Sequence, residues 1–231
     1  MNRRLVGAAA ALVIAALWPV TTRSGFNYQV TIRQITLGEK AVQFISRDLQ
    51  TRRFVAELTR GVGRGEPTLV RLFDWTVEHV RPTPAGFPVV DDHPLHILIR
   101  GYGAEDQRTE AFALLASYAG FPAAKVTLRV PEMDEGLMVA AVRDGSRTLV
   151  FDVVNGLVFR NEDGHLADLT ELSRNPLPVR RAAGDLTIGG VPYARFFEGV
   201  DPRAFSFSRM EGQKPWPRLW QGVTGLFGGR S

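Results

Sequence analysis

The residues best able to do chemistry in this chain lie in one short stretch, where Asp91, Asp92, His93 and His96 are separated only by a proline and a leucine. Carboxylate and imidazole groups bind divalent metal ions and act as general acids or bases. The spacing DDHPLH matches no known ligand motif, and its proline makes the local geometry irregular. We therefore expect a polar loop beside a groove and no metal site. A hydrolase built from the Asp and His residues near 91–106 is the alternative.

A second candidate lies where GYGAEDQ (residues 101–107) opens onto a helical pattern over residues 105–119. The two glycines allow a sharp turn, and Glu105 and Asp106 suit the positive end of a helix dipole. A loop that enters a helix in this way can hold a nucleophile at the helix N-terminus. The position just before the helix is Ala104, so the expected nucleophile is missing.

The composition excludes several further kinds of chemistry. The chain has no cysteine, which excludes disulfides, thiolate metal sites and any thiol nucleophile. Arginine supplies 25 of the 28 basic residues, but these are scattered in short pairs and form no nucleic-acid-binding arm. We expect neither a nucleic-acid partner nor a cofactor. With 45% apolar and 23% charged residues, the 231-residue chain has the balance of a globular protein with a packed core.

The first 24 residues differ from the rest. Arg3 and Arg4 precede 16 apolar residues, Leu5–Val20, a pattern typical of a secretory signal or a short signal anchor. The small-x-small cleavage pattern is poor, which favours an uncleaved anchor over a removed signal peptide. The arginines would stay in the cytoplasm, so we expect a membrane contact through this segment and a periplasmic body anchored at the inner membrane.

The remaining chain reads as helices followed by strands. Apolar periodicity predicts helices over 37–58, from Glu66 to before Pro82, and over 105–119. Prolines make residues 81–100 an extended connection. Alternation predicts strands at 124–130, 137–142, 148–153 and 157–160, with a hairpin at Asp144-Gly145. The predicted class is α+β, with N-terminal helices packed on an antiparallel β-meander.

The end of the chain gives weaker signals. Residues 25–36 suggest a short strand or an extended leader, 166–172 a short helix, and 173–184 a linker. The aromatic and basic tail, 216–230, suits a membrane interface or a partner groove, and docking back on the domain is equally open. The predicted regions are residues 1–24, a helical region 25–66, a core 67–172 and an extension 173–231.

Four segments in order carry a resemblance to a known family: WTVEHVRP, GYGAEDQ opening a helix, LLASYAGFPAAKVTL and VFDVVNGLVF. Together, over residues 69–160, they resemble the transglutaminase-like superfamily, which has a papain-like fold. The resemblance implies a core in which a cysteine at a helix N-terminus, a histidine and an aspartate perform acyl transfer.

The resemblance places the triad positions on Ala104, on Leu137 (or Met138 after a shift of one residue) and on Asp152. Two of the three catalytic groups are therefore absent, and the resemblance implies a degenerate, non-catalytic member. It also implies a surviving groove that includes Trp75, Asp91, Asp92, His93, His96, Tyr102, Glu105, Asp106 and Gln107.

We therefore expect a non-catalytic transglutaminase-like domain at the outer face of a membrane. It would act as a binding or assembly component for a protein partner or a polymer ligand, in cell-envelope or exopolysaccharide assembly. Besides the hydrolase, a scaffold that works through the C-terminal tail remains open.

Overall fold

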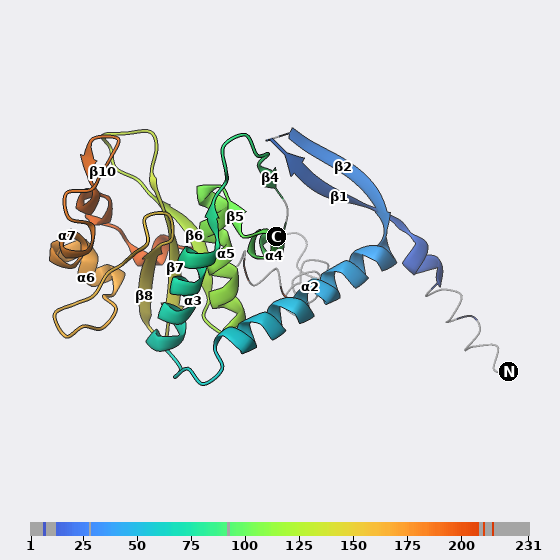
Figure 1. The fold of residues 1–231 in the computed structure, drawn as a ribbon, viewed down its shortest axis with the longest axis horizontal. Helices are drawn as coiled ribbons and strands as arrows, with labels where there is room; N and C mark the ends of the chain where they lie inside the picture. The colour runs from blue at the N-terminus through green and yellow to red at the C-terminus, as the bar shows by residue number, and fades with distance from the viewer. Residues whose placement is uncertain are drawn as a thin grey trace, which may run out of the picture.

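The computed structural model describes residues 7, 13–27, 29–91, 93–207, 210 and 214, which form a mixed α+β structure (Figure 1). Its main sheet is antiparallel and runs in chain order, which confirms the predicted α+β class with a β-meander. The strands of this sheet are β6 (Ala123–Leu128), β7 (Leu137–Asp144), β8 (Arg147–Asp152) and β9 (Leu157–Val158). The long helices, also as predicted, are α2 (Leu37–Leu58), α3 (Glu66–His79) and α5 (Glu105–Tyr118).

The N-terminal part forms a hairpin that leads into α2. Strand β1 (Pro19–Phe26) pairs antiparallel with β2 (Gln29–Thr36), and two residues of β1 also pair with β4 (Val90–Asp91). Thr36 then caps α2: its hydroxyl accepts the Glu39 amide, and the Glu39 carboxylate accepts the Thr36 amide. In Figure 1, α2 reaches from this hairpin to the body of the protein.

Of the predicted membrane segment, residues 1–24, the structure describes residue 7 and residues 13–24. Residues 13–17 are helical, but Pro19 and the β-branched residues after it lead into β1 rather than a longer helix. Nowhere in the described ranges is a helix both long enough and apolar enough to cross a bilayer. This finding corrects the prediction that residues 1–24 anchor the chain in a membrane.

Helix α5 is the centre of the molecule. The sequence predicts one apolar face, but ten of its fourteen residues are buried, among them polar ones such as Arg108 and Thr109. The reason is its position: helices α2, α3 and α4 (Pro94–Arg100) pack on one side of it, and β6 and β7 on the other. Because α5 is enclosed, its polar side chains must find partners inside the protein.

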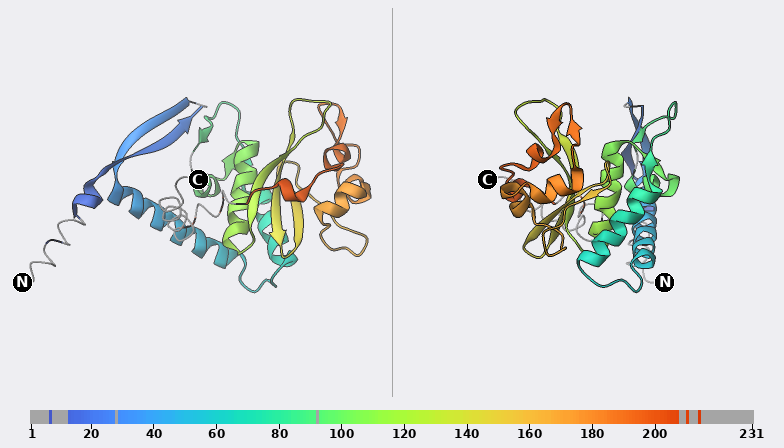
Figure 2. Two further views of the ribbon diagram at one scale, coloured as in Figure 1. Left: turned by 180° about the vertical axis from the view of Figure 1, so that it is seen from behind. Right: turned by 60° about the vertical axis from the view of Figure 1, so that its left-hand side comes forward.

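The main sheet separates two apolar layers. Alternate residues of β7 and β8, including Ala140, Val142 and Phe151, pack against α5. The residues between them, including Val139 and Val150, pack against the C-terminal part of the chain. That part contains α6 (Leu169–Arg174), α7 (Leu177–Ala183), the hairpin of β10 (Thr187–Ile188) and β11 (Val191–Pro192), and the 3-10 helices η1 (Tyr193–Phe197) and η2 (Pro202–Ala204). Figure 2 shows α5 and these C-terminal elements on opposite sides of the sheet.

Two proline-bearing segments predicted to lack helix contain one. Residues 81–100 hold β3 (Arg81–Pro82), which pairs with β5 (Tyr102–Gly103), and also helix α4. Residues 173–184 hold α7. In α4, Pro94 occupies the first helical turn, where its missing N–H costs no hydrogen bond. Proline therefore starts this helix rather than preventing it.

Candidate functional site

The loop that enters α5 is held by hydrogen bonds to its backbone. Gln107 Oε1 accepts the Ala104 amide at 3.1 Å, and Gln107 Nε2 donates to the Val90 carbonyl at 2.7 Å. The Arg100 guanidinium donates to the same Oε1 and to the carbonyls of Val90 and Tyr102. Gln107, predicted to line a groove, is instead buried and positions the turn.

Arg108, one turn further along α5, fills the space between this helix and the sheet. Its side chain donates from Nε to the Val80 carbonyl at 2.9 Å and from a terminal nitrogen to the Val153 carbonyl at 3.2 Å. Burial lowers the pKa of Arg108, and the negative charges of Glu105 and Asp152 partly oppose this effect. Arg108 therefore ties α5 to the segments that follow α3 and β8.

The three positions matched to the triad do not point toward one another. Strand β7 begins at Leu137 and β8 ends at Asp152, and the register places these strand ends side by side. Both side chains, however, alternate with the residues that pack on α5, and Leu137 packs in the layer on the far side of the sheet. By the same alternation, Met138 and Val153 are the residues that face α5 here. Neither side chain can act as a base.

Asp152 has a structural environment of its own. It is fully buried and accepts hydrogen bonds from the Tyr193 hydroxyl at 2.5 Å, the Asn155 amide at 2.9 Å and the Asn155 side chain at 2.7 Å. Burial, together with the charge of Asp152, raises the pKa of Tyr193 well above its usual range. The carboxyl group thus joins β8 to the turn after it and to the C-terminal layer.

Trp75 packs between helices. Its ring meets Phe54 edge-on, with centroids 4.9 Å apart, and stacks on His79 at 4.5 Å. It lines a pocket of about 350 Å³ with residues of α2 and α4, including Leu95 and Ile99. Of the other predicted groove residues whose side chains the structure describes, none lines this pocket.

His93 and His96 belong to the first turns of α4. His93 is its N-cap, with Nδ1 accepting the Leu95 amide at 3.1 Å, and the His96 ring lies 6.3 Å from that of His93. Asp92 and the side chain of Asp91 lie outside the described residues. Among the side chains that the structure describes, no group of three or more His, Cys, Asp or Glu residues is placed to hold a metal ion.

The remaining predicted groove residues have separate partners. The Tyr102 ring lies beneath the Arg100 guanidinium at 5.4 Å. The Asp106 carboxylate contacts the Lys125 ammonium at 3.3 Å, whereas Glu105 is exposed. The predicted groove residues therefore divide between a helix-positioning network, a helix interface and the surface.

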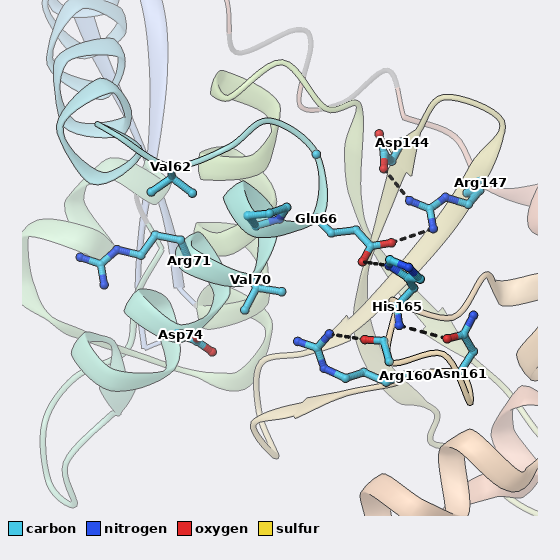
Figure 3. Close-up of a pocket in the computed structure, with 13 residues that line it drawn as sticks. Val62, Glu66, Val70, Arg71, Asp74, Asp144, Arg147, Arg160, Asn161 and His165 are labelled. Atoms are coloured by element: carbon cyan, nitrogen blue, oxygen red, sulfur yellow. Dashed lines mark hydrogen bonds and ion pairs between the residues drawn. The ribbon is translucent and has the colours of Figure 1, made fainter.

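A different part of the molecule forms a groove of about 1020 Å³. One wall is the N-terminal half of α3 with the loop before it, and the other is the β7–β8 hairpin with the loop after β9 (Figure 3). It lies at the β7–β8 turn, the end of the sheet away from Leu137 and Asp152. Its size is at the upper end of the range for ligand-binding sites.

Glu66 is the centre of a charge network in this groove. Its carboxylate accepts hydrogen bonds from Arg147 at 2.8 Å and from the Leu166 amide at 3.1 Å, and His165 Nδ1 lies 3.4 Å away. Arg147 also contacts Asp144 at 2.8 Å. Burial alone would raise the pKa of Glu66, but these hydrogen bonds and the charge of Arg147 lower it below its usual value.

This lowered pKa predicts a pH-dependent contribution to stability. A carboxyl group whose folded-state pKa is depressed stabilises the protein above its unfolded pKa of about 4.3, and the effect is lost as the pH falls toward the folded pKa. Glu66→Gln should therefore lower the free energy of unfolding at pH 7 by about 1–2 kcal/mol. The deficit should shrink below about pH 4.3 in urea titrations between pH 7 and pH 3.

Glu162→Gln is the matched control, because Glu162 is exposed in the neighbouring loop and should leave stability unchanged. A Glu66→Gln deficit that is the same at pH 3 and at pH 7 would contradict this assignment.

The sequence does not predict this groove. Its walls come from residues 62–74, 144–147 and 160–165. Taken alone, the sequence of each segment predicts only a helix start or a turn. The spacing of EPTLVRLFDW does place Glu66, Val70 and Asp74 on one helix face, which is the one available signal. Nothing in the sequence indicates that the two turns lie against that face.

Comparison with known proteins adds no relative: the chain matches no family model, no curated protein and no solved structure.

Proposed function

We propose that this chain is a non-catalytic, degenerate transglutaminase-like domain that works as a binding or assembly component. The observation that carries the proposal is the helix entry at Ala104. There Gln107 and Arg100 hold the start of α5, and alanine stands at the position that the resemblance gives to the nucleophile, while Leu137 and Asp152, at the positions of its two partners, face the far side of the sheet. Binding can persist where such chemistry is absent, because the two use partly separate groups.

The proposed setting is cell-envelope or exported-polysaccharide assembly, with a periplasmic location. This setting rests on the resemblance of residues 69–160 to the superfamily and on analogy with its bacterial members. The rival hydrolase would need His93 and His96 for chemistry, and His93 Nδ1 is already used to cap α4.

A single introduced thiol tests the platform, since the chain has no cysteine of its own. Ala104→Cys places a thiol at the N-cap of the 14-residue helix α5, where the helix dipole favours the thiolate. We expect its pKa, measured from the pH dependence of iodoacetamide alkylation, to fall below the usual value of about 8.5. Ala119→Cys, at the C-cap of the same helix and similarly half-buried, is the control and should not show this decrease.

Acyl transfer is measured on the same proteins. The native chain should neither hydrolyse p-nitrophenyl acetate nor transfer the acyl group of a glutaminyl peptide to hydroxylamine above background, and Ala104→Cys should show no repeated turnover, because neither Met138 nor Val153 can act as a base. Turnover by the native chain would overturn the non-catalytic proposal. If the thiol of Ala104→Cys is no more acidic than that of Ala119→Cys, the start of α5 does not favour a thiolate and does not resemble a nucleophile site.

A further inference from the structure

The groove beside α3 is electrically balanced. Its lining includes three arginines, at 71, 147 and 160, and three carboxylates, at 66, 74 and 144. Figure 3 shows Glu66 of one wall meeting Arg147 and His165 of the other, with Asp144 contacting Arg147. An anionic polymer would meet no net positive charge here, so the charges do not favour one.

Part of this polar lining is available to a ligand. Within the described part of the chain, the side chains of Arg71 and Asp74 make no hydrogen bond or ion pair, and both residues are exposed. Arg160 extends from the facing loop, where one terminal nitrogen donates to the Gly164 carbonyl at 2.7 Å, leaving further N–H groups of the guanidinium. The groove thus offers hydrogen-bond donors on both walls and an acceptor, Asp74, on one of them.

Apolar groups complete the same wall. Val62, Pro67 and Val70 line the groove between the charged positions of α3 and the loop before it. A sugar ring is complementary to this lining. Its hydroxyl groups both donate and accept hydrogen bonds, and its C–H faces are apolar. A hydroxyl group can bridge a carboxylate and a guanidinium, which a purely anionic or purely apolar ligand cannot do.

We propose that this groove binds an uncharged, polyhydroxylated chain, a neutral oligosaccharide, with Asp74 and Arg160 as the main contacts from opposite walls. This inference rests on the proposed binding function and names the class of its ligand. An extended peptide is less favoured. Its backbone carries separate donors and acceptors that pair best with an exposed strand edge, whereas this groove is lined mainly by side chains of a helix and of turns.

The test measures binding to the full chain by isothermal titration calorimetry. The probes are cellohexaose, laminarihexaose and mannohexaose as neutral chains, hexagalacturonate as an anionic chain, and an uncharged hexapeptide of Gly and Ser. We expect at least one neutral hexasaccharide to bind, with Asp74→Asn and Arg160→Gln each weakening its binding about tenfold, since each change removes a hydrogen bond to a charged group. Salt should have little effect.

The controls are Asp134→Asn and Arg203→Gln, which change the same residue types at exposed positions outside the groove and should leave binding unchanged. Loss of binding in these controls, or its persistence in both groove variants, would overturn the site. Absence of binding by every neutral hexasaccharide, or binding of hexagalacturonate or the peptide alone, would overturn the ligand class. Neither result touches the non-catalytic proposal, which fails only if the native chain shows acyl transfer.

Discussion

Asp152→Ala is expected to lower the free energy of unfolding by about 2–4 kcal/mol. The carboxyl group is fully buried and accepts the hydroxyl of Tyr193, which is itself 1% exposed. Removing it leaves that hydroxyl without its partner inside the apolar layer behind the sheet, and a buried polar group left unpaired costs about 1–3 kcal/mol. The space once filled by the carboxyl group adds a further cost. Urea unfolding followed by tryptophan fluorescence measures the change.

A double-mutant cycle with Tyr193→Phe separates this role from a catalytic one. If the two groups stabilise the fold through each other, the double variant should be less destabilised than the sum of the single variants, with a coupling of about 1–3 kcal/mol. Asp201→Ala provides a second comparison, because exposed Asp201 caps η2 through the Arg203 amide and its loss should cost only about 1 kcal/mol. An Asp152→Ala variant as stable as the native protein would show that these buried hydrogen bonds contribute nothing net to the stability of the fold.

The sequence predicts the main elements because each carries a local signal. The helical periodicity of 37–58 and of 105–119, and the alternation in β6 to β8, match the observed elements closely. The errors arise where one local signal has two meanings. Pro94 reads as a helix breaker, yet in the structure it opens α4, since His93 caps that helix and the missing N–H is not needed in the first turn.

The candidate site is harder to predict, because a function of this kind depends on which side of an element a residue faces. The resemblance places the triad aspartate on Asp152, where β8 ends, but a shift of one residue along a strand reverses the face. Gln107 and Arg108 look like solvent-facing residues of an amphipathic helix, but α5 is enclosed and both become buried hydrogen-bond donors. The groove beside α3 depends on contacts between segments up to 100 residues apart in sequence, such as that of Glu66 with the Leu166 amide. No local pattern encodes such contacts.

Arg108→Ala is expected to be at least as damaging as Asp152→Ala, at about 3–5 kcal/mol. The guanidinium donates to two carbonyls, those of Val80 and Val153, and both of these residues are fully buried. Without Arg108, neither carbonyl has this donor, and the aliphatic stem also leaves a gap beside α5. The change is measured as the free energy of unfolding in urea.

Two further variants divide this effect into its parts. Arg108→Met keeps an apolar stem and removes the hydrogen-bond donors. Relative to Arg108→Ala, it should recover only the part of the lost unfolding free energy that comes from packing. Arg108→Lys keeps the charge, but a single ammonium cannot reproduce the planar fork that reaches both carbonyls, so its stability should be intermediate. If Arg108→Met were as stable as the native protein, the two hydrogen bonds would contribute nothing net. The enclosed start of α5 would then be maintained by packing alone.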